Sequence, residues 1–238
     1  MDTGENILAF IPARGGSKSI PLKNLVRVGG RSLLEYAVRA ANACPLISHI
    51  VCSTDHEEIA SHAENLGVAV DRRLATLSGD EINVLDVLKE YLTRTKIIPE
   101  IVVLFQPTSP FLRPADVERV VEVLRNHATA ITAQTVTLVP HNYHAWNQRI
   151  FENGMVKFAS KQERLGAFNK QLKPKLYKFG NVVAVRATAV PVMAEFFEEP
   201  SVGVEVETPY DLDVDGPEDV EMAEALLSSG LVHLPHLD

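Results

Sequence analysis

The stretch that decides the fold is Ile7-Leu8-Ala9-Phe10-Ile11-Pro12-Ala13-Arg14-Gly15-Gly16-Ser17-Lys18, near the start of the chain. Its first five residues form a continuous apolar run of strand length, which is typical of a strand buried on both faces. The run leads into a loop with two adjacent glycines between basic side chains. This order predicts an α/β protein with an anion-binding loop at the carboxyl end of its first strand.

The segments that follow alternate between strand and helix signals. Strands are predicted at residues 7–11, 50–53, 68–70, 101–105 and 130–136. Helices are predicted at residues 32–43, 55–66, 84–91 and 114–126. Such alternation is the signature of a mostly parallel sheet with helices on both faces, and ligands bind such sheets at the carboxyl ends of the strands.

Residues 140–178 break the alternation, because they contain histidines, a tryptophan and many basic residues without a clean period. We interpret them as an excursion from one domain that spans residues 1–238. Beyond it we expect a strand at 180–186, a helix at 189–197, a strand at 203–206 and a helix at 217–227. His141 and His144 have the spacing of a metal pair, but no third ligand lies near them in the sequence, so an oligomer or substrate segment is the better interpretation.

Composition and charge exclude several classes of protein. The chain has 238 residues, 46% of them hydrophobic and 23% charged, which excludes a disordered chain, and no apolar run approaches the roughly 20 residues of a membrane span. No secretory signal is visible and the two cysteines match no redox or zinc motif, so we expect a cytoplasmic protein with reduced thiols.

The charge is unevenly distributed along the chain. The net charge is −8, yet residues 6–34 contain five basic residues and no Asp or Glu, while the last 52 residues carry thirteen carboxylates and no Lys or Arg. A concentrated basic loop in an acidic chain indicates a small polyanionic ligand rather than nucleic acid.

Arg14, Lys18 and Lys23 surround the two glycines of the loop. Backbone N–H groups together with these cations could hold a triphosphate and stabilise a departing pyrophosphate. The spacing is neither the Walker pattern Gly-x4-Gly-Lys-Ser/Thr nor the dinucleotide pattern Gly-x-Gly-x-x-Gly. P-loop ATPases and Rossmann dehydrogenases are therefore disfavoured, whereas an ordinary surface loop remains an alternative on these residues alone.

Four ordered segments resemble the cytidylyltransferases that activate acidic sugars, above all the CMP-N-acetylneuraminate (CMP-sialic acid) synthetases. They are Ile-Pro-Ala-Arg-Gly-Gly-Ser-Lys at 11–18 with Pro-Leu-Lys-Asn at 21–24, Val-Cys-Ser-Thr-Asp at 51–55, Gln-Pro-Thr-Ser-Pro at 106–110 and Asp-Val-Asp at 213–215. The resemblance implies a Rossmann-like nucleotidyltransferase fold. It also implies a reaction in which CTP and an acidic sugar give a CMP-sugar and pyrophosphate.

The resemblance also assigns candidate residues. The nucleotide-binding candidates are Ala13, Arg14, Gly15, Gly16, Ser17, Lys18, Lys23, Asn24, Arg73 and Asp80. The substrate-binding candidates are Gln106, Pro107, Thr108, Ser109, Lys170 and Asn181. The metal candidates are Asp213 and Asp215, which with Arg14, Lys18 and Lys23 make up the catalytic set.

Asp213 and Asp215 suit Mg²⁺. In an extended segment, side chains at i and i+2 point to one face, so the pair offers two hard oxygen ligands that phosphates and water can complete. Asp211 extends the alternation to three carboxylates. The group that accepts the sugar hydroxyl proton stays open among Asp213, Asp215, a metal-bound water and the substrate's own carboxylate.

The sequence departs from the pattern of the sialic acid enzymes at several positions. The motif after Ser109 reads Pro110-Phe111-Leu112-Arg113, one residue longer than usual, and Lys178 stands where an arginine is common. Other acceptors therefore stay open: pseudaminic or legionaminic acid, a Kdo-like sugar or a phosphonate. Two further alternatives are a nucleotidyltransferase with another base and a non-catalytic sugar-nucleotide-binding protein.

In the resembling enzymes the excursion crosses to a second subunit, so the resemblance implies a homodimer. Trp146, Phe151 and Phe158 would supply its apolar anchors, and Lys157, Lys161 and Arg164 would complete the neighbour's site.

Overall fold

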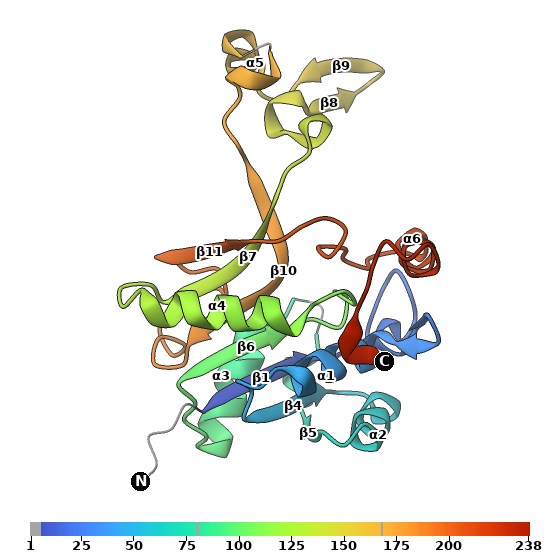
Figure 1. Ribbon diagram of the computed structural model, residues 1–238, viewed down its shortest axis with the longest axis vertical. Helices are drawn as coiled ribbons and strands as arrows, with labels where there is room; N and C mark the ends of the chain where they lie inside the picture. Colours follow the sequence, from blue (N-terminus) through green and yellow to red (C-terminus); the bar gives the residue numbers. More distant parts are fainter. Residues whose placement is uncertain (1–5, 80, 168) are drawn as a thin grey trace.

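The computed structural model describes residues 6–79, 81–167 and 169–238 and has a central sheet of seven strands (Figure 1). Its strands are β1 (Ile7–Pro12), β4 (His49–Thr54), β5 (Ala69–Arg72), β6 (Ile101–Phe105), β7 (Thr132–Leu138), β10 (Tyr177–Arg186) and β11 (Ser201–Glu205). They join in the order β11-β7-β10-β6-β1-β4-β5. All neighbours are parallel except β10, which runs antiparallel to β6 and β7. The predicted α/β fold with a mostly parallel sheet is confirmed.

Both faces of the sheet are buried, as the continuous apolar run of β1 predicts. Ile7, Ala9 and Ile11 belong to one core cluster, which also contains apolar residues of α1 (Leu33–Ala43), α2 (Glu57–Asn65) and α4 (Pro114–Asn126). Leu8 and Phe10 face the other side, where they pack with α3 (Val84–Thr95). The period of two in β1 therefore divides its side chains between two helical layers.

A third core cluster lies at the end of the sheet where the chain finishes. It joins Phe111 and Val214 to residues of α1 and of α6 (Pro217–Ser228). The short elements around it are η1 (Lys23–Leu25), β2 (Arg27–Val28), β3 (Arg31–Ser32) and η6 (Pro235–Leu237), while η2 (Ala75–Leu77) follows β5. This cluster fixes the loops that leave β1 and β6 against the carboxyl-terminal part of the chain.

Residues 139–176 form a distal lobe that stands apart from the body on the extended ends of β7 and β10 (Figure 1). Its elements are η3 (His141–Tyr143), η4 (Ala145–Asn147), β8 (Arg149–Glu152), β9 (Met155–Phe158), α5 (Lys161–Gly166) and η5 (Lys170–Leu172). The Val139 N–H donates to the Leu176 carbonyl at 2.8 Å and closes the base of the lobe. The lobe occupies most of the segment 140–178 in which the alternation of strands and helices was expected to break, whereas residues 177 and 178 belong to β10.

The predicted helix at 189–197 is wrong. The segment forms successive turns, in which the Ala189 and Val192 N–H groups donate to carbonyls three residues earlier. Val190, Met193 and Phe196 are nevertheless buried in the core beside α3, so their spacing of three reflects burial in turns rather than a helix. In the described ranges, no helix combines the length and apolarity that crossing a bilayer requires.

Candidate active site

The loop that follows β1, residues 13–24, is called here the phosphate loop, and hydrogen bonds within it and to the end of β4 hold it. The Ala13 N–H donates to the Ser53 carbonyl at 2.9 Å, the Gly15 N–H to Asp55 Oδ1 at 2.8 Å, and Asn24 Nδ2 to the Arg14 carbonyl at 2.8 Å. The loop is therefore shaped by the end of β4, which lies beside β1 in the sheet.

Gly15 is required by close packing. A Cβ atom at Gly15 would lie 2.7 Å from His56 Cβ, closer than real side chains approach. The first glycine thus lets the loop pass over the β4–α2 connection, whereas Gly16 faces open space and lines a cleft.

The cleft opens at the carboxyl ends of β1, β5 and β6 and has a volume of about 590 Å³. It is lined by Pro12, Arg14, Gly16, Ser17, Lys18, Ser19, Lys23, Asn24, Arg73, Leu77, Gly79, Ile82, Val84, Val87, Gln106, Pro107, Thr108 and Asp215. One side is thus basic, one side is apolar, and the β6 loop adds neutral polar groups. Such a cleft can hold a flat apolar ring and a polyanion together.

Arg73 sits at the junction of these surfaces. Its Nη2 donates to the Ser53 carbonyl at 2.6 Å, and its Nε is buried and has no hydrogen-bond partner among the described residues. Burial lowers the pKa of Arg73, and the nearby Asp55 carboxylate opposes that shift. The side chain stays protonated at neutral pH and retains a donor for a ligand.

Residues 208–215, called here the carboxylate segment, bring Asp213 and Asp215 to the cleft. The buried Val214 between them donates its N–H to the Thr108 carbonyl at 2.7 Å. Asp215 Oδ1 accepts from Lys23 Nζ at 3.3 Å, and the Asp215 carbonyl accepts from Ser19 Oγ. The segment therefore joins the phosphate loop to the β6 loop.

The three alternating carboxylates have different partners. Asp211 is buried and pairs with Lys178 Nζ at 2.8 Å. Loss of water around the Asp213 carboxyl raises its pKa, Asp215 adds to the rise, and a hydrogen bond from Thr108 opposes it. Asp211 is thus paired with a lysine, whereas Asp215 lines the cleft and Asp213 contacts Thr108, which also lines it.

The donor chemistry of Asp213 and Asp215 fits a hard divalent cation such as Mg²⁺. Among residues 6–79, 81–167 and 169–238, no group of three or more His, Cys, Asp or Glu side chains could hold a metal ion. A cation between Asp213 and Asp215 would have to complete its coordination from ligand phosphates and water.

The structure brings most of the predicted residues together in the cleft. Arg14, Gly16, Ser17, Lys18, Lys23, Asn24, Arg73, Gln106, Pro107, Thr108 and Asp215 all line it. Asp213 lies at its edge through Thr108. Ala13 and Ser109 are buried behind the lining, and Asp80 lies outside the described residues.

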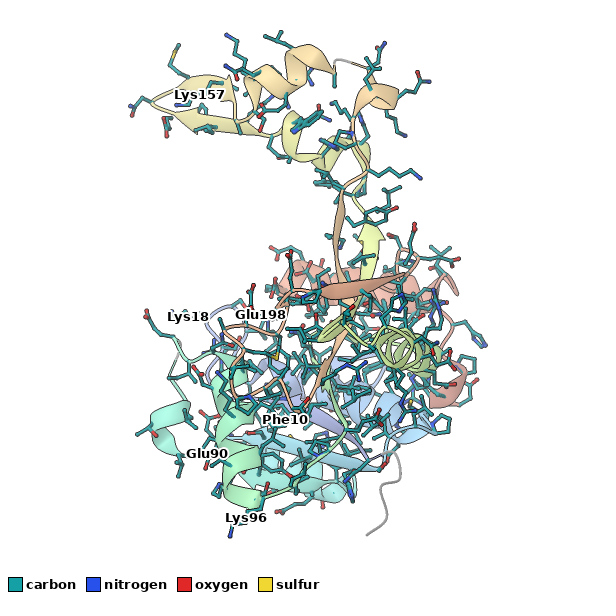
Figure 2. All side chains as sticks on the ribbon, turned by 90° about the vertical axis from the view of Figure 1, so that its left-hand side faces the viewer. Phe10, Lys18, Glu90, Lys96, Lys157 and Glu198 are labelled. Atoms are coloured by element: carbon teal, nitrogen blue, oxygen red, sulfur yellow. The ribbon has the colours of Figure 1, made fainter. Side chains whose placement is uncertain are left out.

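Two predicted substrate residues lie elsewhere. The fully buried Asn181 accepts from Thr135 Oγ1 at 3.0 Å and donates to the Tyr210 carbonyl at 3.0 Å, so its amide is occupied within the body. Lys170 begins η5 in the distal lobe. Figure 2 shows that lobe, which carries Lys157, standing well apart from the body that carries Lys18, so Lys170 does not reach the cleft of its own chain.

The residues predicted from the sequence do not include the apolar side of the cleft, which is formed by Leu77, Ile82, Val84 and Val87. They also do not include Pro12, Ser19 and Gly79. Val84 and Val87 were assigned to a helical core stripe. The sequence did contain a clue, because Ile82 and Val84 flank Asn83. The Asn83 side chain caps α3 at the edge of the sheet where a ligand was expected to bind.

Comparisons with known proteins agree with this geometry. The family model for cytidylyltransferases matches residues 8–226. The CMP-N,N'-diacetyllegionaminic acid synthase of Legionella pneumophila is 30% identical over 93% of this chain and 96% of its own. The N-acylneuraminate cytidylyltransferase A of Danio rerio is 37% identical over 50% of this chain, and the match spans 27% of the fish protein.

A solved structure supports the fold. A CMP:2-keto-3-deoxy-manno-octonic acid synthetase complexed with CTP superposes with a TM-score of 0.72 over 94% of this chain and 99% of its own, at 17% identity.

Proposed function

Because the chain belongs to the cytidylyltransferase family, we propose that it transfers CMP from CTP to a hydroxyl group of an acidic sugar and releases pyrophosphate. The observation that carries this proposal is the convergence of three features on one cleft: the basic phosphate loop, the apolar wall and the carboxylate segment. The bond that forms joins the sugar oxygen to the α-phosphorus. The bond that breaks joins that phosphorus to the oxygen of the departing pyrophosphate, and the hydroxyl proton passes to water or to a nearby carboxylate.

The side chains divide this task between them. Arg14, Lys18 and Lys23 bind the triphosphate and stabilise the negative charge that develops on the leaving group. The apolar wall at Ile82, Val84 and Val87 packs against the cytosine ring, and Gln106 and Thr108 bind sugar hydroxyls. Asp213 and Asp215 would hold Mg²⁺, which would neutralise negative charge on the phosphates.

We propose an acceptor of the sialic or legionaminic acid kind. The support is the relative named as a CMP-N,N'-diacetyllegionaminic acid synthase, which matches this chain over nearly the full length of both proteins. The reaction needs no secretory environment, and the two buried, unpaired cysteines are typical of the cytoplasm, where we place the enzyme.

We also propose a homodimer joined through the distal lobe. Phe151 and Val156 are paired across the β8–β9 hairpin and remain 73% and 61% exposed in the single chain. Exposed apolar pairs of this kind indicate a protein surface that a partner covers. The lobe, residues 139–176, carries seven Lys or Arg and two Glu, so it suits an acidic body and an anionic substrate of a second copy.

The experiment that tests the reaction measures pyrophosphate release from CTP, ATP, GTP and UTP with a panel of acidic sugars and phosphonates, with Mg²⁺ or EDTA. We expect release that needs CTP, Mg²⁺ and one acidic sugar. If CTP raises the melting temperature but no acceptor gives turnover, the chain is a nucleotide-binding protein and the proposed reaction is wrong.

The metal assignment is tested with Asp215→Asn. Because the amide is a weaker ligand for Mg²⁺ than the carboxylate, we expect the half-saturating Mg²⁺ concentration to rise about tenfold or more. Glu218→Gln, which removes a nearby exposed carboxylate of α6, is the control. An unchanged Mg²⁺ requirement in Asp215→Asn would place the metal elsewhere.

A further inference from the structure

Arg113 lies outside the lining of the cleft but contacts the segment that carries its carboxylates. It precedes α4, and its Nε and Nη2 donate to Asp116 Oδ2 at 2.8 Å and to Oδ1 at 3.1 Å. The Asp116 carboxyl is 2% exposed, so this two-point contact is held in a buried place. The orientation of the guanidinium plane is therefore fixed.

The fixed guanidinium lies over the ring of Tyr210, with its Cζ 4.0 Å from the ring centroid. Tyr210 belongs to the carboxylate segment and is half-buried against the core cluster that contains Phe111 and Val214. Its carbonyl accepts from Asn181 Nδ2, so the residue is held from both its ring and its backbone. Three positions later the chain reaches Asp213.

The placement of Asp213 and Asp215 depends on their backbone. Asp215 is solvent-exposed, and the buried residue between the two carboxylates, Val214, is anchored by its side chain and by its N–H on the Thr108 carbonyl. A shift of Tyr210 would be transmitted to this anchor, because Leu212 also donates its N–H back to Pro209 in the turn around Tyr210.

We propose that Arg113 is a positioning residue: by stacking on Tyr210 it fixes the carboxylate segment and thereby holds Asp213 and Asp215 in place for the metal. The metal role rests on the proposed function, whereas the mechanical role does not. The extra residue in the Pro110-Phe111-Leu112-Arg113 motif thus has a structural use, because Phe111 is buried in the same cluster and Arg113 reaches Tyr210. Lysine could keep the charge but not the two-point contact with Asp116.

Arg119, which lies within α4, offers a matched control for Arg113, which is the N-cap residue of that helix. It also donates to Asp116 Oδ1, at 3.3 Å, but its other donor reaches the Glu205 carbonyl rather than Tyr210. Arg113→Lys and Arg119→Lys each weaken one contact of Asp116. A difference between them therefore reports the stacking on Tyr210 and not the stability of α4.

The test is hydrogen exchange of peptides that span residues 208–216, with β6 peptides as the internal reference. We expect Arg113→Lys to speed exchange at Val214 about tenfold and Arg119→Lys to change it less than about twofold. Tyr210→Leu, which removes the ring and keeps an apolar side chain, should reproduce the effect of Arg113→Lys. The positioning role would be overturned if the exchange rate at Val214 were the same in the two arginine variants, or if it did not change in Arg113→Lys.

The Mg²⁺ titration of pyrophosphate release separates this proposal from the proposed function. We expect Arg113→Lys to raise the half-saturating Mg²⁺ concentration severalfold, with a rate at saturating Mg²⁺ close to that of the wild type. If exchange is faster but the Mg²⁺ requirement is unchanged, Arg113 fixes the segment and the assignment of the metal to that segment is what fails.

Discussion

Lys23 connects the phosphate loop with the carboxylate segment, because its ammonium pairs with Asp215. Its backbone lies near the end of the phosphate loop, where η1 begins. Its side chain is 15% exposed, so its charge acts in a partly dry place where electrostatic contacts are strong. A triphosphate in the cleft would compete with Asp215 for this ammonium. Lys23 is thus placed to respond to nucleotide binding and to stabilise the leaving group.

Replacing Lys23 with alanine should lower kcat/KM for CTP about 100-fold or more, since a charged contact that strengthens in the transition state is lost. Steady-state pyrophosphate release measures this. Lys96→Asn is the control, because Lys96 lies at the end of α3 in a left-handed conformation that asparagine accepts. Near-normal turnover in Lys23→Ala would show that the triphosphate binds elsewhere.

At this scale the phosphate loop could be predicted and the apolar wall could not. The residues that give the loop its chemistry are consecutive in the sequence and can be recognised there. Ile82 and Val84 are apolar, and packing in the core would explain them equally well. Their position in the cleft depends on how the connection after β5 returns to the sheet. Asn181 is the opposite case, because its polar side chain suggested a role in substrate binding. In the structure its amide makes hydrogen bonds inside the body, with Thr135 and the Tyr210 carbonyl.

Strand β10 shows how one element can require a single glycine. Its register against β7 shifts between Phe179 and Val183, and there the Thr135 hydroxyl accepts from the N–H groups of Asn181 and Val182 at 2.8 and 3.0 Å. A Cβ at Gly180 would lie 2.5 Å from Thr135 Oγ1 and 2.9 Å from Val206 Cγ2. The irregular register therefore depends on the missing side chain.

We expect Gly180→Ala to lower the free energy of unfolding by about 1–3 kcal/mol, the usual cost of overpacking. Gly203→Ala is the control in the neighbouring strand β11, where the nearest atom to a new Cβ is 3.6 Å away, an ordinary contact. Urea unfolding of both variants measures the difference. Equal stability of the two variants would contradict the role assigned to the register shift.

The short element η6 makes the stability of the fold sensitive to acid. Burial lowers the pKa of His236, Arg39 lowers it further, and Asp238 opposes the shift. The folded state therefore favours the neutral ring, and its stabilising effect, present above the pKa of the unfolded histidine, is lost as the pH falls.

The His236→Gln variant lacks this titration. When the pH is lowered from about 7.5 to about 5.5, a range that spans the ordinary histidine pKa, its free energy of unfolding should fall less than that of the wild type. Urea unfolding at the two pH values measures both losses, and other groups such as His141 contribute equally to each protein. Equal losses would show that His236 titrates normally in the folded state.

Most elements could be predicted because strands such as β1 and β6 are short apolar runs, and because Pro45 and Gly67 follow α1 and α2 as stop signals. The segment at 189–197 could not, since three buried residues spaced three apart fit either a helix or successive turns. The order of the strands in the sheet could not be predicted from the sequence either. It depends on which edge each crossover returns to, and the antiparallel β10 enters from the distal lobe rather than from a helix.

The whole molecule consists of a body and a distal lobe that stands on the extended ends of β7 and β10 (Figure 1). The lobe is rich in Lys and Arg, whereas the rest of the chain is acidic. Phe151 and Val156 are mostly exposed in one chain, so their replacement with serine should weaken association and leave the fold of each chain intact. We expect the double variant to raise the dimer dissociation constant at least about 100-fold in sedimentation velocity experiments. Met222→Ser, at an exposed position on α6, is the control, and an unchanged dimer would show that the interface lies elsewhere.

Whether the lobe serves the neighbouring cleft can be tested by mixing two variants. Lys23→Ala disables the body of one chain, and Arg164→Ala disables the lobe of another, where Arg164 Nη1 donates to Asn147 Oδ1 at 2.7 Å. If each cleft combines one body with its partner's lobe, every mixed dimer regains one intact site. An equal mixture of two inactive variants should then recover roughly a quarter of the wild-type activity. If each lobe serves its own chain, no site is restored and the mixture stays inactive.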